Sequence, residues 1–183
     1  MKKFIALLVL SLVSFPSWSE TTDDLVERDG LFYKKFSDVP FSGEVQGQVQ
    51  GKVKNGKQEG AWVFFHANGQ LYKKGNYHNG KREGPWVEYH DNGQLWLKGE
   101  YKNGEQEGPW VSYFFNGNIF DKGDYENGKK EGVWFSNHLN GKLYKKGDYK
   151  NGKQEGSWVY YDENGALYRD DSGVYKDGVK ISD

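Results

Sequence analysis

A tandem repeat is the feature that most limits what this chain can fold into. The stretch NGKQEGAWVFFHANGQLYKKGNYH, from Asn55 to His78, is followed directly by NGKREGPWVEYHDNGQLWLKGEYK. The step from Gly56 to Gly80 is 24 residues, and five copies keep this step without an insertion until Asp170. A unit of this length cannot bury its own apolar face, so neighbouring units must stack. We therefore expect an extended array of repeats.

Each copy is predicted to be a β-hairpin. The segment Trp62–His66 has the aromatic and β-branched composition of a strand, and Gln70–Tyr77 reads as the returning strand. Asn68 and Gly69 are predicted to form a type I′ turn between them. The segment NGKREG at 79–84 is predicted to be a longer turn into the next copy.

A two-residue turn would fix the register of the hairpin. Trp62 would face Gly75, and Gly60 would face Tyr77, so that a large ring covers each glycine. This pairing gives the Trp and Gly columns a physical reason to occur together, and that reason needs no ligand. The structural repeat columns are Trp62, Trp86, Trp110, Trp134 and Trp158, with Gly75, Gly99, Gly123 and Gly147.

Strand alternation separates the side chains onto two faces. We expect Trp62, Leu71 and Tyr77 on the main packed face and an aromatic stripe with lysines on the other. The candidate binding residues of this stripe are Phe65, Tyr72, Lys74, Tyr89, Trp96, Lys98, Tyr113, Phe120, Lys122, Tyr144, Lys146, Tyr161 and Tyr168. The stripe could bind a ligand. Alternatively, its ring pairs only stabilise the hairpins.

The pattern NGKxEGxWxxxxxNGxLxxKGxY, from Asn55 to about Tyr168, resembles the MORN repeat in the variant common in bacteria. This resemblance implies an all-β fold, an elongated single-layer antiparallel sheet of stacked β-hairpins. It also implies a binding or scaffold module, in some proteins linked to membranes. Some bacterial relatives with this variant are antitoxins of toxin–antitoxin systems.

The first residues have the pattern of a secretory signal peptide. Lys2 and Lys3 precede the apolar run Phe4–Val13, Pro16 follows, and small residues lead to a cleavage site after Ser19. The alternative, a transmembrane anchor, needs about 20 apolar residues, and the run is shorter. We therefore expect a periplasmic or secreted protein of a bacterial envelope.

The chain divides into five expected segments. Residues 1–19 are the signal peptide and residues 20–29 a polar linker. Residues 30–54 form an irregular first hairpin or partial repeat, and residues 55–170 hold the five repeats. Residues 171–183 form one or two closing strands, because the ends of an array must cap exposed edges.

Composition excludes several classes of function. The chain has no cysteine, which excludes disulfides and thiol chemistry. Loss of Lys2 and Lys3 leaves 23 basic against 26 acidic residues, a net charge of 23 − 26 = −3. This balance provides no electrostatic footprint for nucleic acid.

The repeated polar residues give no catalytic or metal site. His66, His90 and His138 share one column, and neighbouring copies lie about 10 Å apart, too far to share a zinc ion. The glutamates of the Glu59 column have similar environments, which disfavours an acid–base pair with split pKa values. We expect a turn or charge-pairing role for them, and hence a non-enzyme without metal or cofactor.

These observations predict a protein that binds another protein in the cell envelope. A second hypothesis gives the aromatic stripe a glycan or a membrane surface as its ligand. A third, by family resemblance alone, is an antitoxin, although an exported protein would not meet a cytoplasmic toxin.

Overall fold

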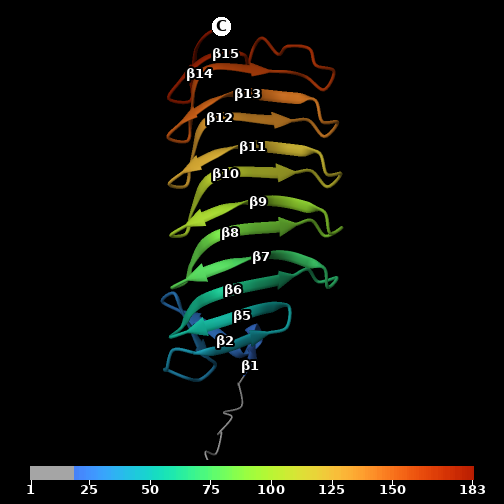
Figure 1. Cartoon of the computed structure of the whole chain (residues 1–183). Helices are drawn as coiled ribbons and strands as arrows, with labels where there is room; N and C mark the ends of the chain where they lie inside the picture. The colour runs from blue at the N-terminus through green and yellow to red at the C-terminus, as the bar shows by residue number, and fades with distance from the viewer. Residues whose placement is uncertain (1–18) are drawn as a thin grey trace, which may run out of the picture.

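The computed structural model describes residues 19–183 as one long single-layer β-sheet with a small hairpin beside its first strands (Figure 1). The sheet has 14 strands in the order β1-β4-β5 and then sequentially to β16. Every pair is antiparallel except β1 with β4. The predicted fold class is therefore confirmed. The expected signal peptide lies outside the described residues, apart from Ser19, which begins β1.

The strands of the array are eight or nine residues long, and the terminal ones are shorter. The sheet contains β1 (Ser19–Thr21), β4 (Gly43–Gln46), β5 (Val49–Lys54), β6 (Lys57–Phe65), β7 (Leu71–His78), β8 (Lys81–Tyr89), β9 (Leu95–Lys102), β10 (Glu105–Tyr113), β11 (Ile119–Glu126), β12 (Lys129–Asn137), β13 (Leu143–Lys150), β14 (Lys153–Tyr160), β15 (Gly173–Lys176) and β16 (Val179–Ser182). A 3₁₀ turn, η1 (Thr22–Asp24), is the helical element of residues 19–183, which include no helix long and apolar enough to cross a membrane.

The tight two-residue turns lie at the opposite ends of the strands from those predicted. Asn79 and Gly80 both have positive φ, 51° and 81°, and join β7 to β8 as a type I′ turn. At the other end of the strands, in the connection from β6 to β7, only Gly69 has positive φ. There the His66 amide donates to the Gln70 carbonyl at 2.8 Å and the Gly69 amide donates to the His66 carbonyl at 2.9 Å. The predicted type I′ turn at Asn68-Gly69 is therefore wrong, and the connection is a longer loop.

This loop shifts the register near the end of each hairpin. Trp62 faces Gly75 and Gly60 faces Tyr77, as predicted, but Phe65 faces Leu71. Tyr72 is the extra residue of a β-bulge. The bulge reverses the alternation of side chains between the loop and Lys73, and the residues from Lys73 onward keep their predicted faces. The predicted faces of Leu71 and Tyr72 are therefore exchanged.

The tryptophans of the Trp62 column form the buried row of the sheet although no second layer covers most of them. Their exposed fractions are 0–3 %. Each ring lies over a glycine of the preceding strand, as Trp86 does over Gly75 and Trp110 over Gly99. The predicted covering of Gly75 by Trp62 is wrong, because the ring above it belongs to the next copy. Gly60 has no covering ring and instead supplies a positive φ of 70° at a separate register shift, between β5 and β6.

Tyrosines alternate with these tryptophans along the array. Tyr77 lies between Trp62 and Trp86, with ring centroids 6.0 and 5.6 Å away in edge-to-face geometry. The same alternation continues to Tyr175, 6.5 Å from Trp158. This row of rings ties each repeat to the next one.

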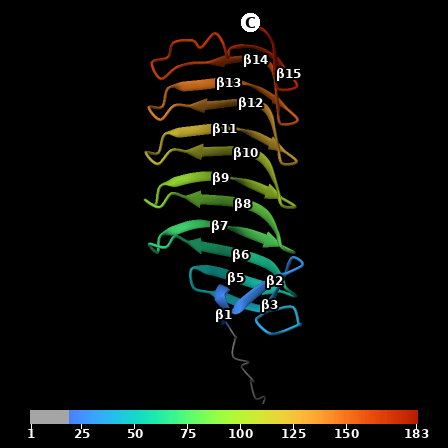
Figure 2. The ribbon, with the colours of Figure 1, turned by 180° about the vertical axis from the view of Figure 1, so that it is seen from behind.

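The N-terminal segment is ordered differently from the expectation. Residues 20–29, expected to be a linker, instead contain most of β1, η1 and β2 (Leu25–Arg28). β2 pairs with β3 (Leu31–Lys34) in a separate hairpin, and this hairpin packs on one face of the sheet (Figure 2). Its apolar side chains, among them Leu25 and Phe32, cover the small core around Trp62. Burial of these side chains gives the polar segment a structure that its composition did not indicate.

The C-terminal end closes the array with short strands. Within residues 55–170 the fifth repeat lacks a full returning strand, since only an isolated bridge joins Tyr161 to Leu167. β15 takes its place, with Gly173 facing Trp158 and Tyr175 facing Gly156. Residues 171–183 thus hold β15 and β16.

Candidate binding surface

The sheet presents two chemically different faces. We define the Trp face by the tryptophan row, the tyrosines of the Tyr77 column and the side chains of the Phe64 and Lys73 columns. We define the Val face by the other side of the same strands. Its apolar members are Val63, Val87, Val111, Phe135 and Val159, with the Phe65 and Leu71 columns.

The structure divides the predicted aromatic stripe between these two faces. Tyr144 lies on the Trp face, where its ring centroid is 5.9 Å from that of Tyr160. Tyr72 also turns this way, and its ring lies 4.8 Å from that of His66. The stripe residues on the Trp face are therefore Tyr72, Trp96, Phe120 and Tyr144.

The remaining stripe residues do not join them. Those on the Val face are Phe65, Lys74, Tyr89, Lys98, Tyr113, Lys122, Lys146 and Tyr161. Tyr168 lies in the irregular segment before β15 and is 51 % exposed. The prediction of one continuous aromatic–lysine stripe is wrong because the bulge moves the Tyr72 column to the other face.

The Val face has a shallow hollow of about 470 Å³ over β8–β11. Val87, Val111 and Ile119 contribute apolar surface, with Tyr113 at one end. The exposed Lys98 and Lys122 also line it.

The Trp face carries charged side chains that interrupt the repeat pattern. Lys73, Arg82 and Glu88 form what we name the first charged cluster. The Arg82 guanidinium lies 4.9 Å from the rings of Trp86 and Tyr101 and donates to the Tyr101 hydroxyl at 2.6 Å. The Glu88 carboxylate is buried and accepts a hydrogen bond from the Trp86 indole at 2.8 Å.

Lys73 completes this cluster without an ion pair among residues 19–183. Its ammonium group lies 4.7 Å from the centroid of the Phe64 ring and 5.0 Å from that of Tyr72. Partial burial lowers the pKa of Lys73, while the negative charge of Glu88 acts in the opposite direction.

A second charged cluster, formed by Asp121, Lys130 and Lys145, has the same composition and lies two to three copies further along. Lys130 forms an ion pair with Asp121 at 2.9 Å, and the other oxygen of Asp121 accepts from the Ser136 hydroxyl at 2.7 Å. Lys145 lies 5.9 Å from the centroid of the Trp158 ring, with no ion pair among the described residues. Partial burial lowers its pKa too, with Asp121 opposing and Lys130 adding to that shift.

Between the clusters the Trp face has a small hollow of about 60 Å³. Its lining combines apolar and aromatic side chains with polar ones: Leu97, Trp110, Val111, Tyr125 and Trp134, and Gln106, Ser112 and Asp121. Sequence reasoning missed the clusters and this hollow, because it searched the columns that repeat and these residues occupy the columns that vary.

The histidines join neighbouring loops. His66 Nε2 lies 3.0 Å from the Tyr89 carbonyl, His90 Nε2 lies 2.9 Å from that of Tyr113, and His138 repeats the contact. Because a carbonyl can only accept, Nε2 is the donor. Asn68 similarly donates to the Asp91 carbonyl of the next copy at 2.9 Å. Residues 19–183 bring together no group of three side chains suited to a metal ion.

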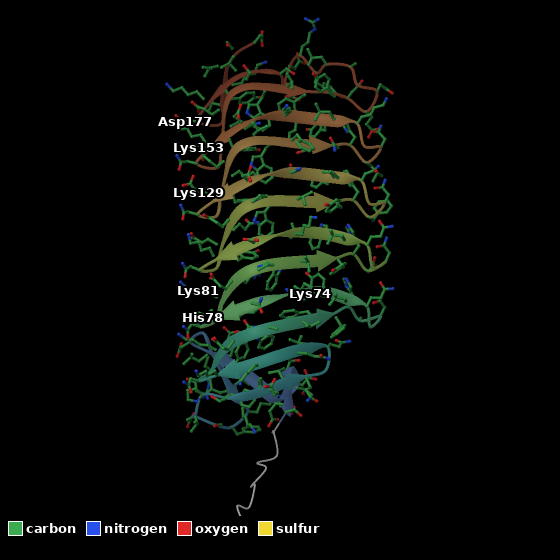
Figure 3. The ribbon with its side chains drawn as sticks, viewed as in Figure 1. Lys74, His78, Lys81, Lys129, Lys153 and Asp177 are labelled. Atoms are coloured by element: carbon green, nitrogen blue, oxygen red, sulfur yellow. The ribbon has the colours of Figure 1, made fainter. Side chains whose placement is uncertain are left out.

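The glutamates of the Glu59 column stabilise the type I′ turns. Glu59 accepts a hydrogen bond from the Asn79 amide at 2.9 Å, and Glu83 does the same for Asn103 at 2.7 Å. Lysines surround these turns, and Lys81, Lys129 and Lys153 follow one edge of the sheet while Lys74 lies away from it (Figure 3). Of the two expected roles, stabilising a turn or pairing with lysines, these carboxylates have the first.

The sequence matches the profile of the family described as MORN repeat variant over residues 58–79, 82–103, 106–129 and 130–151. No curated protein matches the chain. A solved structure described as "Crystal structure of GtfA/B complex bound to UDP and GlcNAc" is 14 % identical, with a TM-score of 0.19. The alignment covers 80 % of this chain and 28 % of that one. With the stacked hairpins described above, the family match shows that residues 58–151 are a run of MORN repeats of the variant type.

Proposed function

We propose that this chain is a non-enzymatic module that binds another protein on its Trp face and acts as a scaffold in the cell envelope. One observation carries the proposal. The β2–β3 hairpin already packs on the first strands of the Trp face (Figure 2). The same row of rings continues beyond this hairpin along the sheet. This intramolecular packing of extended polypeptide supports the choice of the Trp face as the binding surface. MORN repeats commonly serve as protein- or membrane-binding modules, which agrees with this choice.

The polar residues of the array support a binding role rather than catalysis. The repeated glutamates each accept an amide of a turn, and the histidines donate to a carbonyl of the next loop. These side chains have structural partners, and their environments repeat from copy to copy. Neither arrangement separates an acid from a base, as general acid–base catalysis requires.

Cross-linking from each face would test the assignment. A photoreactive amino acid would replace Phe120, 44 % exposed on the Trp face, or Val133, 53 % exposed beside the apolar columns of the Val face. The full chain would be expressed in its native host and the adducts identified by mass spectrometry. We expect one reproducible protein adduct from position 120 and none from position 133. Adducts from position 133 alone would overturn the assignment of the face, and no protein adduct from either would overturn the function.

The envelope location rests on the signal pattern of residues 1–19. The proposal predicts that the mature protein begins at Glu20 and fractionates with periplasmic or secreted proteins. N-terminal mass spectrometry of the native protein would check both. An intact Met1 or Lys2 terminus in the cytoplasmic fraction would contradict export.

A glycan or lipid is a second candidate ligand because aromatic rings remain accessible on the Trp face. Trp96 and Phe120 are 39 % and 44 % exposed and lie one repeat apart in the same column. Such rings can stack on the apolar face of a sugar. Titration with cell-wall oligosaccharides and with liposomes, followed by tryptophan fluorescence, would distinguish a glycan ligand from a lipid ligand. No shift with either would exclude this candidate.

The antitoxin role rests on the family resemblance. It predicts a toxin gene beside this gene and protection by a chain that lacks residues 1–19. Co-expression of that shortened chain with the neighbouring gene product would test it, and failure to restore growth would exclude it.

A further inference from the structure

The two charged clusters on the Trp face indicate the chemistry of the partner. We propose that the Trp face binds an extended acidic segment, with one carboxylate at each charged cluster and a small side chain between them. This inference rests on the proposed function, since it specifies what the protein partner presents to that face.

Each cluster contains two cations and one carboxylate. In the first, Arg82 is engaged by the Tyr101 hydroxyl and Glu88 by the Trp86 indole. Lys73 remains over aromatic rings, with no ion pair among residues 19–183. The positive charge of Lys73 therefore has aromatic rings beside it and forms no ion pair with a carboxylate of residues 19–183.

The second cluster likewise has one more positive charge than negative charges. Lys130 and Asp121 pair with each other, and Lys145 remains over the Trp158 ring. A partly buried ammonium group without a carboxylate loses hydration that rings replace only in part. A carboxylate from a partner would restore a charge-assisted hydrogen bond at each site.

The spacing of the clusters sets the spacing of the acidic residues. Lys73 lies on β7 and Lys145 on β13, which are six strands apart in the sheet. Neighbouring strands are about 4.8 Å apart, so the two backbones are separated by about 29 Å. An extended chain advances about 3.3 Å per residue, and the two carboxylates should therefore be about nine residues apart.

The hollow near Leu97 and Trp110 lies on β9–β12 and reaches Asp121 of the second cluster. Its volume of about 60 Å³ and its mixed polar and apolar lining suit a small side chain midway along the segment. The intramolecular precedent is the β2–β3 hairpin, which places the apolar Leu25 and Phe32 against the core around Trp62. The proposed segment would continue this existing interface along the same face.

Labelled synthetic peptides and matched lysine variants would test the proposal. The probe carries two glutamates about nine residues apart, a valine midway, and serine or threonine elsewhere. One comparison peptide has glutamine in place of glutamate, and another places the two glutamates side by side. Fluorescence anisotropy would measure binding to the full chain.

The chain offers its own controls, because a second lysine follows each lysine of interest. Lys73→Gln and Lys145→Gln remove charge from the Trp face, whereas Lys74→Gln and Lys146→Gln remove it from the same strands on the Val face. We expect each variant of the first pair to reduce the affinity for the probe peptide about tenfold. Each variant of the second pair should change this affinity less than about twofold. Circular dichroism would confirm that all four variants fold.

Three outcomes would overturn the acidic-segment proposal. These are equal weakening by both pairs of variants, equal binding of the two glutamate spacings, and no binding of the probe. The cross-linking at position 120 separates this failure from that of the proposed function. A protein adduct there with no lysine dependence leaves the function standing and removes only the assigned partner chemistry.

Discussion

The indole ring of Trp86 occupies the space in which a side chain at Gly75 would begin. A Cβ atom built on Gly75 would lie 2.0 Å from Cε3 of that ring. Four other glycines meet the next tryptophan in the same way, at 2.2–2.3 Å. The contact between repeats therefore depends on the absence of a side chain at this position.

Gly75→Ala should consequently destabilise the array. The added methyl group must displace a ring that is 0 % exposed and packed between Tyr77 and Tyr101. Overpacking of this kind costs about 1–3 kcal/mol. Urea unfolding followed by tryptophan fluorescence would measure the loss, with the exposed Asn76→Ala as the control. An unchanged midpoint for Gly75→Ala would show that the ring does not lie on the glycine.

Asn127 and Asn116 should respond in opposite ways to glycine, although both precede a glycine in the sequence. Asn127 has a φ of 48° in a type I′ turn, so Asn127→Gly should change the free energy of unfolding by less than about 0.5 kcal/mol. Asn116 accepts from the Asn118 amide and donates to the Leu139 carbonyl. Asn116→Gly should therefore cost about 1–2 kcal/mol. Equal effects in urea unfolding would contradict the assignment of the two turns.

These turns show what the sequence could and could not reveal. The period, the hairpins and the pairing of Trp62 with Gly75 followed from spacing and from β-propensity. The connections at both ends of the strands contain Asn-Gly, and the dipeptide alone does not tell whether its Asn takes positive φ. That choice depends on contacts to the next copy, such as the bond from Asn68 to the Asp91 carbonyl. One bulge then decided the face of Tyr72, and with it the composition of the candidate site.

The charged clusters could not be predicted for a related reason. Lys73 and Lys74 are neighbours in the sequence and chemically identical, yet they lie on opposite faces. Only the register shows that Lys73 shares a face with Arg82 and Glu88. Pattern reasoning assigns weight to repeated residues, whereas a specific partner is recognised by residues that differ between repeats.

Acid should weaken the array through Glu59. The Asn79 amide, and after it His78, hold the pKa of the Glu59 carboxyl below its ordinary value of 4.5. The unfolded chain therefore takes up the proton first as pH falls. The stabilisation is complete above pH 4.5 and declines as pH falls through the lower folded-state value. Urea midpoints measured through this range should fall less steeply for Glu59→Gln, and identical slopes would contradict the hydrogen bond to Asn79.

Alkali should weaken the C-terminal repeats through Tyr160. Burial raises the pKa of this phenol from 10.0 to about 12, although the Gln154 amide, 2.6 Å away, acts to lower it. A raised pKa means that the folded state holds the proton more tightly than the unfolded state. The stabilisation is therefore complete below pH 10.0 and is lost as pH rises towards about 12.

Tyrosinate absorbance would follow this group directly. Tyr160→Phe should remove a late-titrating phenol and flatten the loss of stability above pH 10.0, because the folded state then has no buried hydroxyl to ionise. Tyr168→Phe is the matched control, since that side chain is 51 % exposed. If both variants removed phenols that titrate at the same pH, Tyr160 would not be shielded on the Trp face, and its packing against Trp158 at 6.0 Å would be in error.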